Sequence, residues 1–102
     1  MAAQSGEISA PPQSRVLQPI GELVWREHGI VAGTVRSVCV QPRAGLATLE
    51  ATVFDASGGV TVVLLGRRRL AGLRPGAHLR LEGVVGDHHG KLAFLNPSIH
   101  VG

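Results

Sequence analysis

The stretch from Ala47 to Phe54 alternates between two kinds of side chain at every step. Leu49, Ala51 and Val53 fall on one face, and Thr48, Glu50, Thr52 and Phe54 fall on the other. A period of two is typical of a β-strand with one buried face. The 102-residue chain also contains 14 glycines and 6 prolines, which favours many short strands joined by turns.

Four further stretches have strand character, and Gly-, Pro- or Asp-containing turns separate them. They are Ile30–Val40, Val60–Leu65, His78–Val85 and Lys91–Leu95, with Ile99–Val101 extending the last pairing beyond Asn96-Pro97. Between the third and fourth strands, Leu70 and Leu73 are spaced three apart, which predicts one short helix between about Arg67 and Leu73. The sequence therefore predicts an all-β, five-stranded barrel with a short helix between strands 3 and 4.

The first 15 residues differ in composition from the rest of the chain. Residues 1–15 are small, polar and proline-containing, so we expect a disordered N-terminal tail. A length of 102 residues fits one domain, which we place at residues 16–102. The stretch Val16–Trp25 is ambiguous, because Pro19 and Gly21 argue against a long helix there.

Several short motifs between Gly29 and Val101 resemble the OB-fold nucleic-acid-binding family. They are Val31–Val35, Phe54–Val60, Leu64–Arg69, Leu73–Gly76, Leu81–Val85 and Phe94–Pro97. In order and spacing they are most similar to the wedge domain of bacterial branch-migrating helicases and to small stand-alone actinobacterial OB proteins. The resemblance implies a Greek-key OB barrel that binds single-stranded or branched nucleic acid.

Nine of the ten basic residues are arginines, and the net charge is +3. Arginine offers a planar fork that matches phosphate geometry and stacks on bases. Arg67, Arg68 and Arg69 open the predicted helix, where an anion would also gain from the helix dipole. We therefore expect phosphate contacts there, or else a solvated turn. Candidate contacts beyond that run are Arg36 in the first strand, Arg43 in the first loop and Lys91 in the last hairpin.

The chain has only three aromatic residues. Phe94 lies in an apolar strand and is expected in the core. Phe54 lies on a polar strand face, where it is either a platform for a base or tucked beneath a loop. Trp25 lies among charged residues and either packs against the protein or stacks on a ligand. So few stacking residues predict weak binding with little base specificity.

No residue pattern indicates catalysis, a metal or another cofactor. Cys39 is the sole cysteine and is expected to be a small buried residue, because it lies between two valines. His88 and His89 are adjacent, so on an extended chain they point apart and do not share a metal. No secretory signal and no membrane-spanning stretch is visible, so we expect a cytoplasmic protein without a membrane partner.

These observations favour a non-catalytic module that binds single-stranded DNA or RNA mainly through arginine–phosphate contacts. The alternative is a protein-interaction module that docks a partner or a second copy through the barrel face or the Val16–Trp25 segment. The arginine cluster favours the first hypothesis, and the scarcity of aromatic residues favours the second.

Overall fold

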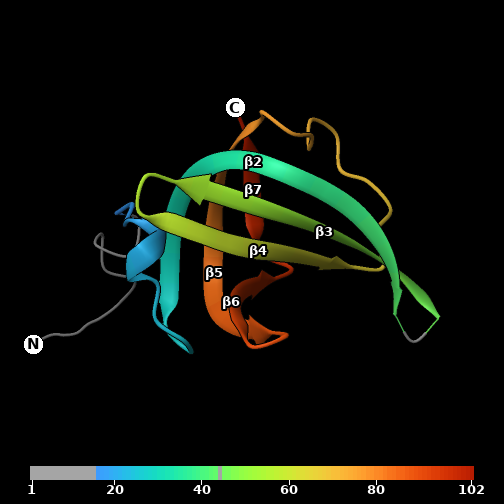
Figure 1. Ribbon diagram of the computed structural model, residues 1–102, viewed down its shortest axis with the longest axis horizontal. Helices are drawn as coiled ribbons and strands as arrows, with labels where there is room; N and C mark the ends of the chain where they lie inside the picture. The colour runs from blue at the N-terminus through green and yellow to red at the C-terminus, as the bar shows by residue number, and fades with distance from the viewer. Residues whose placement is uncertain (1–15, 44) are drawn as a thin grey trace, which may run out of the picture.

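The computed structural model describes residues 16–43 and 45–102. The expected tail, residues 1–15, lies outside the described residues. In the described part six strands follow a single turn of 3₁₀ helix, so the predicted all-β class is confirmed (Figure 1). They are η2 (Ile20–Glu22), β2 (His28–Arg43), β3 (Leu46–Asp55), β4 (Gly58–Leu65), β5 (His78–His88), β6 (Lys91–Leu95) and β7 (Ser98–Val101).

The long strand β2 takes part in two ladders. Its first half pairs antiparallel with β5, from His28 opposite Val84 to Thr34 opposite His78. Its second half pairs antiparallel with β3, from Thr34 opposite Phe54 to the end of the strand. A β-bulge between Val35 and Ser37 follows the change of partner. Because a bulge increases twist and bends a strand, β2 can serve both ladders.

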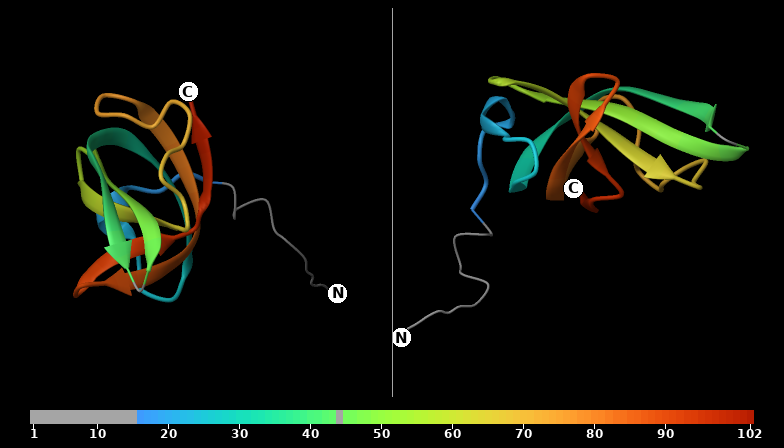
Figure 2. Two further views of the ribbon diagram at one scale, coloured as in Figure 1. Left: turned by 90° about the vertical axis from the view of Figure 1, so that its right-hand side faces the viewer. Right: turned by 90° about the horizontal axis from the view of Figure 1, so that it is seen from below.

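The remaining pairings close the sheet into a barrel-like ring. From β3 the ladder continues antiparallel to β4, then parallel to β6, then antiparallel to β5, which returns to β2. Five strands thus make the ring. β7 pairs with β5 at Leu79–Glu82 and β6 pairs with β5 at Val85–His88, so the last predicted strand is split in two around Pro97. The strands curve around a common centre, and the β2–β3 hairpin extends beyond the others (Figures 1 and 2).

The interior of the ring is filled with aliphatic side chains and Phe94, which is fully buried as the sequence predicted. The alternation is confirmed over most of β3, because Leu49, Ala51 and Val53 are buried while Thr52 and Phe54 are partly exposed. Thr48, expected on the polar face, is instead fully buried. Burial of this apolar surface is the main force that holds the ring together.

The predicted helix between about Arg67 and Leu73 is wrong. Residues 66–77 form turns and irregular backbone instead. Gly66 and Gly72 have φ angles of +75° and +81°, in the left-handed region that a right-handed helix excludes. Leu70 and Leu73 pack against the core from this irregular connection. Their spacing of three residues therefore reflects two separate apolar anchors. In the described residues η2 is the only helical element, and no helix there could cross a membrane.

The N-terminal segment is fastened to the β3–β4 turn. Ile20 is buried, and its N–H donates to Asp55 Oδ2 at 2.9 Å, while the Gly21 N–H donates to Ser57 Oγ at 2.8 Å. The other carboxylate oxygen of Asp55 accepts the N–H groups of Ser57 and Gly58 at 2.7 and 3.1 Å. The hydrogen bonds to Asp55, the one from the Ile20 N–H foremost and the one from the Ser57 hydroxyl next, lower the pKa of Asp55 from 3.8 to about 2.

This fastening predicts how stability responds to acid. Because the folded pKa of Asp55 lies below its ordinary value, its contribution is fully present above pH 3.8 and is lost as pH falls towards about 2. Thermal midpoints of the protein and of Asp55→Asn should differ most above pH 4 and converge below it. A difference that stays constant from pH 5 to pH 2 would contradict this assignment.

A second prediction concerns Thr48, which is fully buried and whose hydroxyl has no hydrogen-bond partner in the described structure. Thr48→Val removes a desolvated polar group and keeps the branched shape. We expect stabilisation by about 1 kcal/mol and a rise of roughly 4 °C or more in the melting midpoint. A lower midpoint would mean that the hydroxyl has a partner in solution.

Candidate functional site

A groove crosses the outer face of β3 and β4, the face turned away from the core. It consists of two adjoining cavities of about 520 and 210 Å³, which share Thr52, Thr61 and Lys91. Thr52 and Thr61 are register partners on β3 and β4 and form the middle of the floor. The larger cavity is also lined by Ile20, Gly21, Phe54, Gly58, Gly59, Val60 and Leu92, and the smaller by Cys39, Glu50, Ala51, His88 and His89.

Phe54 lies at one end of this groove beneath an arginine. The guanidinium carbon of Arg36 is 3.7 Å from the centre of the phenyl ring. Below it, Gly59 is opposite Phe54 in the ladder, and a Cβ at Gly59 would lie only 2.4 Å from ring atom Cε2. Because Gly59 has no side chain, the ring can lie flat against β4 and carry the guanidinium. Phe54 is thus neither an open platform for a base nor tucked beneath a loop, because it lies between Arg36 and Gly59.

The position of Arg36 depends on the bulge in β2. Val35 is opposite Val53 and Ser37 is opposite Thr52, so Arg36 is the extra residue between two consecutive pairs. Its side chain is exposed on the outer face and is free to lean over Phe54. A cation over an aromatic face is held by the ring quadrupole, which contributes about 0.5–1 kcal/mol at an exposed site.

The other end of the groove is polar and better shielded from solvent. His88, at the end of β5, places Nε2 3.5 Å from Glu50 Oε2, and the two side chains are only 12% and 15% exposed. The Ser37 and Thr52 hydroxyls are 2.7 Å apart across β2 and β3. The β5–β6 hairpin therefore leans against the outer face of β3 and forms a wall of the groove. Lys91, at the start of β6, adds an exposed cation to this wall.

The structure brings some of the predicted site residues together and separates others. Phe54 and Lys91 line the groove, and Arg36 lines neither of its cavities but lies over the Phe54 ring at its end. Trp25 is 52% exposed in the turn before β2, with the Arg26 guanidinium carbon 4.4 Å from its ring, and lines neither cavity of the groove. Arg43 ends β2 near the hairpin tip, and its side chain lies outside the described structure.

The arginine run after β4 lies away from the groove. Six strand steps separate Gly59, beside Phe54, from Leu65 at the end of β4, a distance of about 20 Å. Arg68 and Arg69 are exposed on the connection, and Arg67 lines a separate cavity. This connection contains no helix, so no helix dipole stabilises an anion there, in contrast to our expectation.

The prediction that Cys39 is buried is wrong, because its side chain is exposed in the groove. The bulge explains the error, since the extra residue shifts the alternation after Val35 and leaves Val38, not Cys39, packed against the core. Sequence reasoning also missed Thr52, Thr61 and His88. The alternation of β3 carried a signal for Thr52, whereas His88 reaches the groove only through tertiary folding. Within residues 16–43 and 45–102 no group of three His, Cys, Asp or Glu side chains could hold a metal ion.

No protein-family model and no curated protein matches this chain in the comparisons made.

The packing of Phe54 on Gly59 leads to a prediction with a matched control. Gly59→Ala would force the phenyl ring off β4, and we expect a loss of about 1 kcal/mol and a fall of about 4 °C or more in the melting midpoint. Gly58→Ala is the control, because its Cβ would make only ordinary contacts at 3.6 Å with Gly21. Equal midpoints for the two variants would show that the ring does not occupy this position.

Proposed function

We propose that this chain is a non-catalytic module that binds single-stranded nucleic acid in the groove across β3 and β4, and that its ring is a five-stranded barrel of the OB type. The observation that carries the proposal is the guanidinium of Arg36 layered on Phe54 at one end of the groove, with Lys91 along its wall. A planar stacking surface and exposed cations in one groove suit bases and phosphates respectively.

The strand pairing supports the OB assignment. The ring order is β2-β3-β4-β6-β5, with the only parallel ladder between β4 and β6 among the described pairings. OB barrels bind oligonucleotides on the face of their second and third strands and with the loop between their fourth and fifth strands. Counted in chain order, these elements are β3, β4 and the β5–β6 hairpin. They are also the elements that line the groove.

The layered pair of Phe54 and Arg36 favours unpaired bases over a duplex. Guanidinium planes stack on exposed bases, whose flat faces are accessible only when the strand is single. The outer plane of Arg36 is the surface that a base would meet, and the ring beneath holds it in place. With one such platform in the groove, binding is weak and tolerant of sequence.

Phosphate contacts divide between two places on the molecule. Lys91 lies beside the platform and reaches the backbone of a short strand. Arg68 and Arg69 lie at the other end of β4, so only a longer strand contacts them. Glu50, which is 3.5 Å from His88, lines the smaller cavity and not the one that contains Phe54.

A protein-docking function is the second candidate, and exposed apolar residues before β2 favour it. Val16, Leu17, Val24 and Trp25 are each 48–63% exposed. Apolar side chains gathered in one segment of a chain are suited to burial against a partner.

Anisotropy titrations with labelled strands of about 4 and about 16 nucleotides test the nucleic-acid proposal. Phe54→Ala should weaken binding of both lengths by about 1 kcal/mol, because it removes the ring that supports the Arg36 guanidinium, and should leave the salt dependence nearly unchanged. Replacing Arg68 and Arg69 together with Gln should leave the short strand unaffected. On the long strand it should flatten the slope of log affinity against log salt by about 1.4.

Trp25→Ala is the aromatic control and should leave both affinities unchanged, because Trp25 lies outside the groove. Circular dichroism confirms the fold of each variant before the affinities are compared. Absence of binding to DNA and RNA of both lengths at low salt would refute the proposed function. A loss with Trp25→Ala and none with Phe54→Ala would refute the groove as its site.

A further inference from the structure

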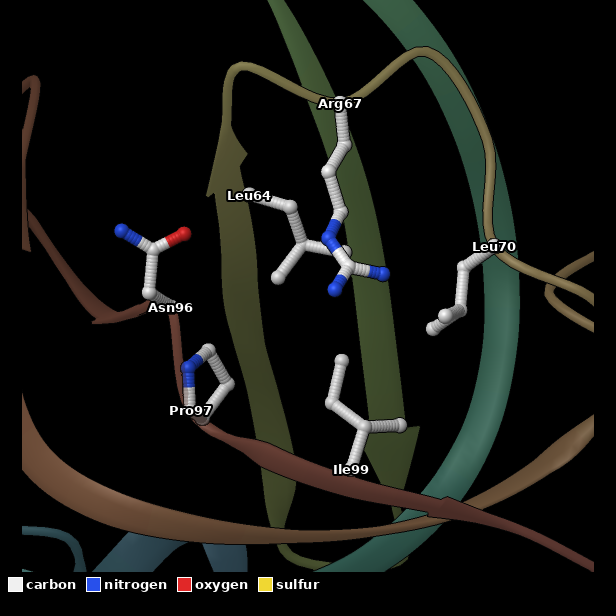
Figure 3. A pocket seen from close by; sticks show the side chains of 6 residues that line it. All are labelled: Leu64, Arg67, Leu70, Asn96, Pro97 and Ile99. Atoms are coloured by element: carbon white, nitrogen blue, oxygen red, sulfur yellow. The ribbon is translucent and has the colours of Figure 1, made fainter.

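A second cavity, separate from the groove, opens at the end of β4. It measures about 230 Å³ and lies between the connection that follows β4 and the turn that joins β6 to β7 (Figure 3). Its lining residues are Leu64, Arg67, Leu70, Asn96, Pro97 and Ile99. None of them lines the groove described above.

The lining of this cavity combines aliphatic side chains with two polar ones, Arg67 and Asn96, and the Arg67 cation projects into it. Figure 3 shows the Arg67 side chain extending from the connection between Leu64 and Leu70, with its guanidinium above Ile99. Within the described residues this guanidinium has neither an ion pair nor a hydrogen bond. The Arg67 side chain is exposed, so its charge is accessible to an anion that lies next to the apolar lining. The arrangement is therefore suited to a ligand that combines an anion with an apolar group.

The opposite wall of the cavity is held firmly in place. The side chain of Asn96 accepts the Leu65 N–H at 3.0 Å, and the Asn96 N–H donates to the Val63 carbonyl at 2.8 Å. The turn is thereby fixed to the edge of β4, and Pro97 adds a rigid ring to the lining. A wall that is already ordered loses little conformational entropy on binding.

The surroundings of the cavity are strongly basic. The connection from Gly66 to Ala77 contains Arg67, Arg68, Arg69 and Arg74 and no acidic residue. Such a local excess of positive charge raises the concentration of anionic ligands near the opening and speeds their association.

We propose that this cavity binds the C-terminal residue of a partner polypeptide that ends in an aliphatic amino acid. In such a residue the carboxylate and the apolar side chain leave the same Cα, so the two groups are as close together as Arg67 and the aliphatic walls. The fork of the guanidinium donates two parallel hydrogen bonds to a carboxylate. A nucleotide fits less well, because the lining contains no aromatic ring on which a base could stack.

This site is independent of the proposed nucleic-acid groove, from whose platform it is separated by the length of β4. One molecule can therefore hold a short strand in the groove and a partner's C-terminus at the same time, whereas a longer strand that reaches Arg68 and Arg69 comes next to the cavity. Failure of one site to bind leaves the other testable.

Fluorescence anisotropy with three labelled peptides tests the proposal on the full chain. The first ends in Gly-Ser-Gly-Ser-Leu with a free carboxylate, the second is its C-terminal amide, and the third replaces the terminal Leu with Gly. The first should bind, and the other two should bind about tenfold or more weakly, because each lacks one of the two matching groups. Arg67→Gln should weaken the first peptide by a similar factor.

Arg74→Gln is the matched control, since it removes an equal charge from the same connection and does not line the cavity. It should leave the affinity within about twofold, and thermal melts verify that both variants are folded. Equal binding of the acid and the amide, or equal effects of Arg67→Gln and Arg74→Gln, would overturn the proposal. So would absence of binding by the first peptide, or its displacement by a 5′-phosphorylated oligonucleotide from the unaltered protein but not from Arg67→Gln.

Discussion

The double pairing of β2 is the constraint on which the other features of this protein depend. One continuous strand pairs with β5 through its first half and with β3 through its second. Because the same backbone belongs to both ladders, the sheet must curve until β4 meets β6, and the aliphatic faces of the strands then enclose the core. The outer face of β3 and β4 is left exposed as a curved surface. The groove and its layered Phe54 and Arg36 lie on that surface.

The parts of the fold that depend on local periodicity could be predicted from the sequence. The alternation of Leu49, Ala51 and Val53 predicted which face of β3 is buried, and the Asp- and Gly-containing turn after Phe54 predicted where that strand ends. The helix prediction failed because a spacing of three between Leu70 and Leu73 fits one helical turn as well as two anchors of an irregular loop. The positive φ angles of Gly66 and Gly72 exclude the helix, and the spacing of apolar residues carries no information about these angles.

The candidate site was only partly predictable. Phe54 and Lys91 were identified from the sequence, but the stacking of Arg36 on Phe54 depends on a bulge that leaves no mark in the residue pattern. The same bulge led to the wrong interpretation of Cys39. The contact between His88 and Glu50 joins residues 38 positions apart, so only the closed ring brings them together. In contrast, the arginines at 67–69 are adjacent in sequence, yet Arg67 turns into a cavity that its neighbours do not line.

Because Arg36 lies in a bulge, its side chain is not part of the pairing between β2 and β3. The residues on either side of it, Val35 and Ser37, pair with two consecutive residues of β3, so the ladder has no need of the residue between them. A change of the side chain at this position leaves the register of β2 and the inward direction of Val38 unchanged, provided that the bulge itself is kept. Position 36 is therefore an adjustable one, because the side chain above Phe54 can be exchanged or shortened while the core contacts of the ring keep their partners.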